Sequence, residues 1–348
     1  MGNLSIPMTT AAGMGPLPQM LERMAGSAAL SRVFRREALP LALIEDRDMR
    51  LPLVALCGLF EAASHEAGDR TFGLRIGEAM LPGSYGLWAE YGTAAGTLAE
   101  ALRRMVATID VRQTGSSMSL RRTGDHVVWG FAHGIGQTAG RQHADHVIGP
   151  MRRFVGAFLG AGWTPSWIEL NYPTDGDADL LERHWHTRIR FGAPAAGIAI
   201  PVDRLPVRRR RAVDAGRARH LTSLDLIADA RRRQARDPLH VVEELVALRL
   251  MDGEVDIDGL ARLAGTSVRA LQRTLHERGY SYREVLGMVR HRRAAALLAE
   301  TDISITEIAM VLGYAEVASF TRAFVRWAGV PPSLLRSAGD RPAEELSA

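Results

Sequence analysis

Lysine is absent from this chain of 348 residues, so the 43 lysine-or-arginine positions are all arginine. The absence excludes sites that need a lysine amine, such as a P-loop nucleotide site, a protein kinase site or a pyridoxal phosphate enzyme. The single cysteine, Cys57, excludes a disulfide framework and is typical of a reducing compartment. Residues 1–20 lack a secretion signal and no run of about 18 apolar residues occurs, so we expect a cytoplasmic protein with no membrane partner.

The composition is that of a folded protein with more than one domain. Hydrophobic residues make up 47% of the chain, and its length is great for one domain and sufficient for two. The formal net charge is only +4, yet residues 262–293 contain eight arginines against two glutamates. Positive charge is therefore concentrated in one stretch, as in proteins that bind nucleic acid.

Residues 256–332 contain the same plan twice: a helix, a tight turn and a second helix. In the first copy, apolar residues recur at helical spacing from Ile257 to Ala264, and Gly265-Thr266 ends this helix. Ser267 then occupies the N-cap position of the second helix, whose apolar face includes Leu271 and Leu275. The opposite face of the second helix carries four polar side chains: Arg269, Gln272, Arg273 and His276.

The polar face of this second helix has side chains suited to reading base pairs. In such a unit the second helix lies in the major groove of DNA, where each base pair presents its own pattern of donors and acceptors. Arginine can pair with guanine and glutamine with adenine, and each good pair discriminates by about 1–3 kcal/mol. We expect Arg269, Gln272 and Arg273 to contact bases, and Ser267 and His276 to make backbone or secondary contacts. An ordinary solvated helix face is the alternative.

The second copy makes double-stranded DNA the expected partner. Ser304 and Glu307 have the spacing of a capping box, and residues 317–327 follow as a helix with an aromatic core stripe. Its outer side is chemically weaker than that of the first copy. Arg322 is a candidate for base contact, and Ser304, Ser319 and Thr321 are candidates for backbone or secondary contact.

Residues 282–298, between the two copies, are predicted to form one long amphipathic helix with a basic stretch. This helix would hold the units at a fixed distance, and units roughly 34 Å apart meet successive major grooves on one face of the duplex. Arg290 in this helix is a candidate for contact with the DNA backbone. Binding should weaken steeply with salt, because each neutralised phosphate releases counterions.

These motifs resemble the DNA-binding domain of AraC/XylS-type transcription regulators. The resemblance covers residues 238–337 and rests on residues 267–275, 279–282, 290, 308–309, 312–314, 319–324 and 329–333. It implies an all-α domain with two helix-turn-helix units joined by a linker helix, in which the first recognition helix makes most base contacts. The second recognition helix often carries a polar pair in this family, whereas this chain has Val317 and Ala318 there. We therefore expect sequence specificity to come mainly from the first unit.

Residues 51–204 mix helical and strand patterns, which predicts an α+β domain. Helices are expected at 51–64, 97–109 and 144–159, a β-hairpin at 118–122 and 126–132, and short strands at 167–172, 187–191 and 197–202. Four aromatic side chains could line an apolar effector pocket, although core packing is the default interpretation: Tyr85, Trp88, Tyr91 and Trp129.

The N-terminal part is similar to the ligand-sensing, arabinose-binding-like domain of a subset of AraC-type regulators. The similarity rests on residues 74–77, 82–87, 97–102, 187–194 and 198–201. It implies a small-molecule effector domain that can also mediate dimerisation, so an effector, a second copy of the chain and RNA polymerase join DNA as candidate partners. The domain plan is then a flexible N-terminus at 1–20, the effector domain at 21–205, a basic linker with a short helix at 206–237, the DNA-binding domain at 238–337 and a flexible tail at 338–348.

Two histidine pairs raise the question of a metal site. His143 and His146 would share a face of a helix, and His184 and His186 would share a face of a strand. Two ligands do not make a site, and no cysteine or acidic cluster along the sequence completes one. We interpret these residues as structural histidines and Cys57 as a core residue, and expect no metal and no cofactor besides the effector.

The leading hypothesis is a transcription regulator whose N-terminal domain binds an effector and alters how the DNA-binding units are presented. An enzyme tethered to DNA is the second hypothesis. No nucleophile elbow, P-loop, dinucleotide fingerprint or paired metal motif supports it, so we expect no enzyme activity. An architectural DNA-binding protein is the third, and the large, near-neutral N-terminal part argues against it.

Overall fold

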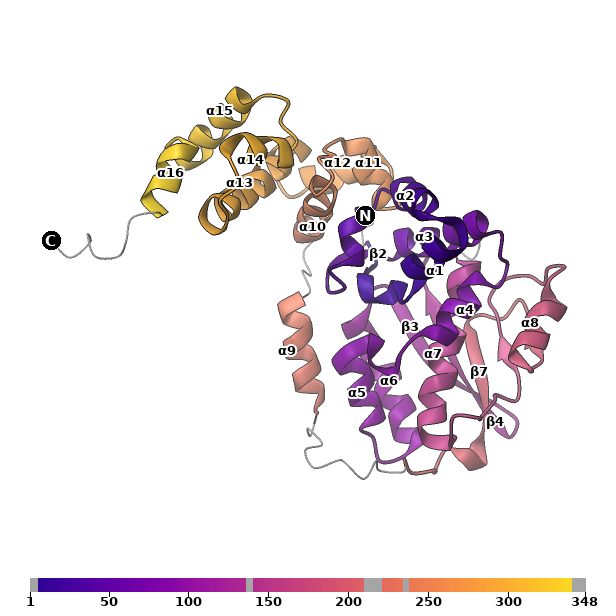
Figure 1. Ribbon diagram of the computed structural model, residues 1–348. Helices are drawn as coiled ribbons and strands as arrows, with labels where there is room; N and C mark the ends of the chain where they lie inside the picture. Colours follow the sequence, from indigo (N-terminus) through magenta and orange to yellow (C-terminus); the bar gives the residue numbers. More distant parts are fainter. Residues whose placement is uncertain (1–5, 136–139, 210–220, 234–237, 340–348) are drawn as a thin grey trace. The chain divides into compact units, whose positions relative to one another are not determined.

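The computed structural model describes residues 6–135, 140–209, 221–233 and 238–339 (Figure 1). The chain divides into two compact units: the N-terminal unit comprises Ser5–Glu37 and Leu43–Ala235, and the C-terminal unit contains Arg236–Ala348. The first unit combines helices with a sheet and the second is helical, which confirms the predicted fold class. Within the described ranges, no helix is long and apolar enough to cross a membrane.

A five-stranded sheet in the order β3-β4-β7-β5-β6 lies in the N-terminal unit. Strands β3 (Ser116–Thr123) and β4 (His126–His133) form the predicted hairpin. Strand β7 (Ala196–Pro201) pairs antiparallel with both β4 and β5 (Ile168–Glu169), and β5 pairs parallel with β6 (Ile189–Arg190). The short strands are confirmed: β5 and β6 are shorter than their predicted ranges, and β7 has the predicted length but begins one residue earlier.

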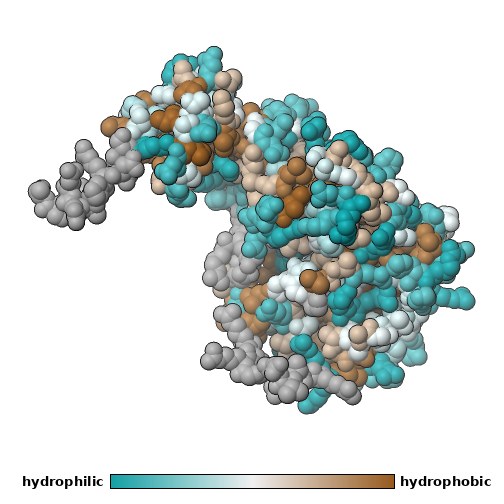
Figure 2. Space-filling view, in the orientation of Figure 1, coloured by the Kyte–Doolittle hydropathy of each residue, from teal (hydrophilic) through white to brown (hydrophobic). Residues whose placement is uncertain are grey.

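Helices on one side of this sheet enclose the core of the N-terminal unit. Helix α6 (Leu98–Arg112) packs against β3, and α7 (Arg141–Leu159) packs against β7 (Figure 1). The Thr97 side chain caps α6 by accepting a hydrogen bond from the Glu100 amide. Trp129 and Ile198 of the sheet share one apolar cluster with Met105 and Ile148 of these helices. The visible surface of the unit is largely hydrophilic, with small separate hydrophobic patches (Figure 2).

Helix α4 (Phe72–Ala79) packs on α7 with the two backbones in direct approach. A Cβ atom on Gly77 would lie 2.2 Å from the carbonyl oxygen of His146, and one on Gly149 would lie 2.3 Å from the carbonyl carbon of Gly77. Both distances are shorter than any real contact, so only glycine permits this approach. The contact brings α7, and with it His143 and His146, against the helices that precede the sheet.

The beginning of the chain is folded, so the predicted flexible N-terminus at 1–20 is wrong for residues 6–20. Strand β1 (Met8–Thr10) pairs with β2 (Arg50–Pro52), and a 3-10 helix (Ala11–Met14) leads into α1 (Leu17–Ala25). Helices α1 and α2 (Ser27–Arg36) pack on α3 (Leu53–Ala67). Burial of this apolar segment against distant residues holds it in place. Residues 1–5, and residues 340–348 of the predicted tail, lie outside the described residues.

The predicted linker begins as part of the N-terminal unit. The Leu98 amide donates to the Val207 carbonyl, and the Arg209 guanidinium donates to the Thr93 carbonyl. Helix α9 (Ser223–Arg233), close to the short helix predicted there, packs against α6 and α5 (Gly86–Thr93), and its Leu226 side chain is buried in the same core. The N-terminal unit therefore extends beyond the predicted boundary at residue 205.

The C-terminal unit consists of short helices around one long one, as predicted. They are α10 (Pro238–Leu250), α11 (Ile257–Leu263), α12 (Val268–His276), α13 (Tyr282–Glu300), α14 (Ile305–Val311), α15 (Val317–Ala328) and α16 (Pro332–Gly339). Helix α13 contacts α10, α14 and α16, so the predicted linker helix is also the centre of this unit's packing.

Candidate nucleic-acid interface and ligand cavities

The turn between α11 and α12 is built by local interactions. The Asp256 side chain caps α11 by accepting from the Gly259 amide at 2.5 Å, and the Ser267 hydroxyl caps α12 by accepting from the Ala270 amide at 3.2 Å. Gly265 between the helices has a φ of 63°, a left-handed conformation that glycine adopts without strain. The predicted cap at Ser267 is confirmed, and these contacts set the start and direction of α12.

The outer face of α12 presents the polar residues that the sequence predicts to contact DNA. Four of them are exposed and border one groove of about 770 Å³: Arg269, Gln272, Arg273 and His276. The opposite face is buried through Leu271, Leu275 and the methyl-bearing Thr274. The structure thus brings the three base-contact candidates of the first helix-turn-helix and His276 together on one exposed surface, which we call the α12 face.

Arg249 at the end of α10 stabilises the first helix-turn-helix. No sequence pattern identified this residue as important. Its side chain is 4% exposed and pairs with Asp256 and, at 3.3 Å, with Glu254. A Cβ atom on Gly259 would lie 2.1 Å from the Arg249 Nη2 atom, so glycine leaves the space that the guanidinium fills. Because Asp256 also caps α11, Arg249 links α10 to α11, the first helix of the first helix-turn-helix.

The second helix-turn-helix repeats the plan with a poorer outer face. Ser304 and Glu307 form the predicted capping box, and Gly313 has a φ of 70° at the turn. Helix α15 buries Phe320 and Phe324, and leaves Arg322 exposed with its Nη2 atom donating to the Ser319 hydroxyl at 3.1 Å. Val317 and Thr321 are half-buried and Ala318 is exposed. Arg322 and, one turn later, Arg326 are the exposed arginines of α15, and the expected inequality of the two units stays a prediction.

Arg290, a candidate for contact with the DNA backbone, is engaged inside the C-terminal unit. Its Nε atom donates to the Leu312 carbonyl at 2.8 Å and its Nη2 atom to the Gly313 carbonyl at 3.0 Å. The guanidinium carbon lies 4.2 Å from the centre of the Tyr314 ring. These contacts tie α13 to the end of α14, and so we assign Arg290 a structural role in place of the expected DNA contact.

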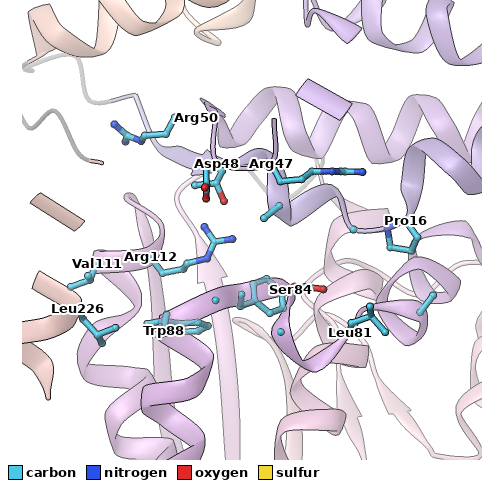
Figure 3. Close-up of a pocket in the computed structure, with 17 residues that line it drawn as sticks. Pro16, Arg47, Asp48, Arg50, Leu81, Ser84, Trp88, Val111, Arg112 and Leu226 are labelled. Atoms are coloured by element: carbon cyan, nitrogen blue, oxygen red, sulfur yellow. The ribbon is translucent and has the colours of Figure 1, made fainter. Parts of the chain in front are cut away.

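Two cavities lie in the N-terminal unit. The deep cavity, of about 90 Å³, is lined mainly by apolar and aromatic side chains from the sheet, α6 and α7, together with His143 and His146. The outer cavity, of about 620 Å³, is lined by residues that include Arg47, Asp48, Arg112 and Leu226 (Figure 3). Tyr85, Trp88 and Arg112 line both cavities. One ligand could therefore contact groups that belong to both.

Three of the four aromatic residues expected at a pocket line the deep cavity. Trp88 and Trp129 are buried, and the Tyr85 hydroxyl lies 3.4 Å from the His146 Nε2 atom. Tyr91 lines neither cavity, since its ring packs under the Arg104 guanidinium with 4.8 Å between the guanidinium carbon and the ring centre. The sequence could not separate Tyr91 from Tyr85 and Trp88, because these three aromatic residues lie on one short stretch of chain.

The cavities contain buried polar atoms without a hydrogen-bond partner among the described residues. In the deep cavity these are Thr9 Oγ1, Trp129 Nε1, His143 Nδ1 and His146 Nδ1, and in the outer cavity Arg47 Nη1. Burial lowers the pKa of His146 to about 3, so its ring is neutral at physiological pH. Such groups favour an occupant that can hydrogen-bond with them, because an unsatisfied buried polar atom costs about 1–3 kcal/mol.

A buried ion pair fixes the start of α7 beside these cavities. The Arg70 Nη1 atom lies 2.6 Å from Asp145 Oδ2, and the Tyr172 hydroxyl donates to Asp145 Oδ1 at 2.5 Å. Asp145 is fully buried. Burial raises the pKa of Asp145 to about 6, although the Arg70 guanidinium opposes this shift. No sequence pattern predicted the network, which joins segments far apart in the chain.

Two family models match the chain. The arabinose-binding domain of AraC transcription regulators, an N-terminal domain, matches residues 28–205, and a helix-turn-helix domain matches residues 260–338. The ornithine utilization regulator of Pseudomonas aeruginosa is 41% identical over 83 residues, which make up 24% of each chain. The HTH-type transcriptional regulator GlxA of Rhizobium meliloti is 39% identical over 87 residues, 24% of this chain and 27% of that one.

The chain spans about a quarter of the length of these curated relatives. Among solved structures, the transcriptional regulator CdpR from Pseudomonas aeruginosa is similar over 89% of this chain and 97% of that chain. The sequence identity is 23% and the TM-score is 0.42.

Proposed function

Because the chain belongs to the AraC family of transcription regulators, we propose that it reads operator DNA mainly through the α12 face and that a small molecule bound in the N-terminal cavities controls this activity. The α12 face carries the proposal for DNA. It combines two arginines and a glutamine, all exposed, on a helix whose start and direction are set by Ser267 and Gly265. These are the side chains that form bidentate pairs with guanine and adenine.

The second unit has a supporting role in this proposal. Arg322 and its partner Ser319 can contact phosphate, and the small side chains of Val317 and Ala318 allow close approach to the duplex. Specificity would then reside in the α12 face, while α15 contributes affinity and orientation.

The cavities support a ligand with an apolar body and a hydrogen-bonding or anionic group. The deep cavity offers aromatic and aliphatic walls with unpartnered imidazole and indole nitrogens, and the outer cavity adds Arg47, Arg50 and Arg112 against Asp48. Figure 3 shows the Arg112 side chain extending toward Asp48, between the two walls. Acceptor groups of a ligand would pair with the unpartnered nitrogens of Arg47, the indole and the imidazoles while its apolar part fills the deep cavity.

Leu226 is the residue through which a bound ligand would influence the DNA-binding unit. It lines the outer cavity beside Val111 and Trp88 (Figure 3), and it belongs to α9, the last helix of the N-terminal unit before the chain enters α10. A ligand that packs differently against Leu226 in two positions of α9 would shift the equilibrium between them. The expected contacts with RNA polymerase and with a second copy of the chain, and the expected lack of enzyme activity, stay predictions.

The DNA proposal can be tested in two steps. Binding sites are first selected from random duplex DNA, and the protein is then titrated with the selected operator and with a scrambled duplex. Arg269→Ala and Gln272→Ala should each weaken operator binding about 5- to 150-fold, which corresponds to about 1–3 kcal/mol, and should affect the scrambled duplex much less. Arg183→Ala removes an exposed arginine of α8 (Ala178–Trp185) in the N-terminal unit and should leave both affinities unchanged. If both α12 variants still distinguished the operator from the scrambled duplex as well as the wild-type protein does, the proposal would be contradicted.

To test the ligand proposal, the protein is incubated with a bacterial metabolite extract, and the compounds that the protein retains are identified by mass spectrometry. We expect a compound that is retained unchanged, raises the melting temperature and is lost in Arg112→Gln. Turnover of the compound would indicate an enzyme, and retention by Arg112→Gln with unchanged affinity would place the ligand elsewhere.

A further inference from the structure

Three side chains with metal-binding chemistry meet in the core of the N-terminal unit, although they lie on three separate elements. Cys57 belongs to α3, His133 ends β4 and His143 lies in the first turn of α7. One possible ligand atom from each residue lies within 4.8 Å of those of the other two. Cys57 and His143 are 0% and 4% exposed, and His133 is half-buried.

The hydrogen bonding of the cluster leaves ring nitrogens available for a metal. His133 Nδ1 donates to the Ile135 carbonyl at 3.1 Å, so the lone pair of this ring is on Nε2. His143 Nδ1 is buried and has no hydrogen-bond partner among the described residues. Most buried polar atoms in folded proteins have a hydrogen-bond partner, and this nitrogen is an exception.

Gly140 shows where two of the ligand atoms converge. A Cβ atom at this position would lie 3.2 Å from His133 Nε2 and 3.7 Å from Cys57 Sγ. The φ of Gly140 is −165°, outside the left-handed range that favours glycine, so this angle does not require a glycine there. The absence of a side chain instead keeps a space open beside both atoms.

We propose that Cys57, His133 and His143 bind a divalent transition metal ion of the Zn²⁺ class, with the fourth position open. Sulfur and imidazole ligands in this combination suit Zn²⁺, with distances of about 2.3 Å to sulfur and about 2.0–2.1 Å to nitrogen. Tetrahedral geometry then separates adjacent ligand atoms by roughly 3.5 Å. Side-chain movements of about 1 Å are enough to bring atoms now within 4.8 Å into this arrangement.

Binding of a divalent ion to this cluster displaces one proton. Burial, together with the carboxylates of Glu61 and Glu37, raises the pKa of the Cys57 thiol, so the metal-free protein carries the neutral thiol. On binding, the sulfur–hydrogen bond of Cys57 is replaced by a sulfur–metal bond, and the proton passes to solvent without any redox change.

This site goes beyond the proposed DNA and effector functions, because neither of them requires a metal ion. Its ligands nevertheless connect α3, β4 and α7, and His143 also lines the deep cavity. A bound ion would therefore stabilise the N-terminal unit against unfolding, by an amount that rises with the concentration of free metal.

Titration of tag-free, chelator-treated full-length protein with Co²⁺ tests the proposal. Since Cys57 is the only cysteine, a thiolate-to-Co²⁺ charge-transfer band can arise only from this residue. We expect one Co²⁺ per chain, this band together with visible bands of tetrahedral Co²⁺, loss of both on addition of Zn²⁺, and a higher melting temperature with Zn²⁺. Weak Co²⁺ binding without the thiolate band, or no binding, would overturn the proposal.

Variants distinguish the cluster from other histidines. His143→Gln should weaken Co²⁺ binding more than about 100-fold, because loss of an indirect partner of a metal ligand already costs about 10–100-fold. His146→Gln is the matched control, since His146 is also buried on α7 and also has an unpartnered Nδ1 atom, and it should keep the band and the affinity. Gly140→Ala, which retains all three ligands, should weaken binding and provides a second test if His143→Gln does not fold. If His143→Gln folds and binds Co²⁺ with wild-type affinity, the assignment is overturned. If His143→Gln does not fold, wild-type affinity of Gly140→Ala for Co²⁺ overturns it.

Discussion

Replacing Arg70 by methionine removes the charged partner of Asp145 while keeping much of the side-chain volume. In the folded protein, the Arg70 side chain is 15% exposed and Asp145 is 0% exposed, and Arg70 also donates to the Tyr172 hydroxyl at 3.0 Å. Because the pair is buried, loss of one partner leaves a desolvated carboxylate at the start of α7. Breaking such a pair typically costs about 3–5 kcal/mol.

Uptake of a proton by Asp145 limits this loss. The folded-state pKa of Asp145 is about 6, above its ordinary value of 3.8, so its contribution to stability is present at low pH and is lost as the pH rises through 6. Removal of Arg70 raises this pKa further, and each pH unit between about 6 and the raised value then adds about 1.4 kcal/mol to the difference in stability between the two proteins. We expect Arg70→Met to lose about 3 kcal/mol at pH 8 and clearly less at pH 5.

The loss of stability is measured by urea unfolding at pH 5 and pH 8, monitored with a probe that reports on the N-terminal unit. A loss of about 3 kcal/mol corresponds to a fall in melting temperature of roughly 6–12 °C for a unit of this size. The double variant Arg70→Met with Asp145→Asn should recover much of the loss at pH 8. As control, Arg75→Met breaks the half-exposed pair with Asp69 and should cost less than about 1 kcal/mol. A cost below about 1 kcal/mol for Arg70→Met, or a larger cost at pH 5 than at pH 8, would refute the reasoning.

Three further outcomes are expected. Gly77→Ala should destabilise the N-terminal unit by more than about 3 kcal/mol in urea unfolding, because its Cβ atom would meet the backbone of α7 at 2.2 Å; a loss within about 1 kcal/mol would mean that the helices can separate at little cost. Arg290→Met should lower the melting temperature of the C-terminal unit, but leave the salt dependence of DNA binding unchanged; a reduction of the salt slope by about one would show a phosphate contact after all. Ser267→Ala should destabilise the C-terminal unit by about 1 kcal/mol, as measured by circular dichroism during thermal unfolding, and a change below about 0.3 kcal/mol would argue against its cap.

The helix-turn-helix units were predictable because their signals are local. Caps at Ser267 and Ser304, left-handed glycines at the turns and apolar residues at helical spacing all act within a few positions of one another. The separation of a polar α12 face from a buried one follows from the same spacing. For this reason the sequence predicted both the helices and the surface that faces outward.

The ordered N-terminus and the fate of Tyr91 could not be predicted in this way. Strand β1 is three residues long and gains its stability from pairing with β2, about 40 positions later in the chain. Tyr91 has the same aromatic character as Trp88, but its partner is Arg104 of the next helix. In both cases a distant residue decides between alternatives that are locally equivalent.

By itself, the sequence determined the fold class, the two-unit plan and the α12 face, since each depends on periodicity and capping over short distances. Only the tertiary structure decided that Arg290 braces the C-terminal unit, that Leu226 reaches a cavity and that Cys57 meets His133 and His143. Likewise, Arg70 and Asp145 are 75 positions apart and pair only when α7 packs beside α4. Contacts of this kind depend on which surfaces are buried together, a property of the whole fold that no short segment encodes.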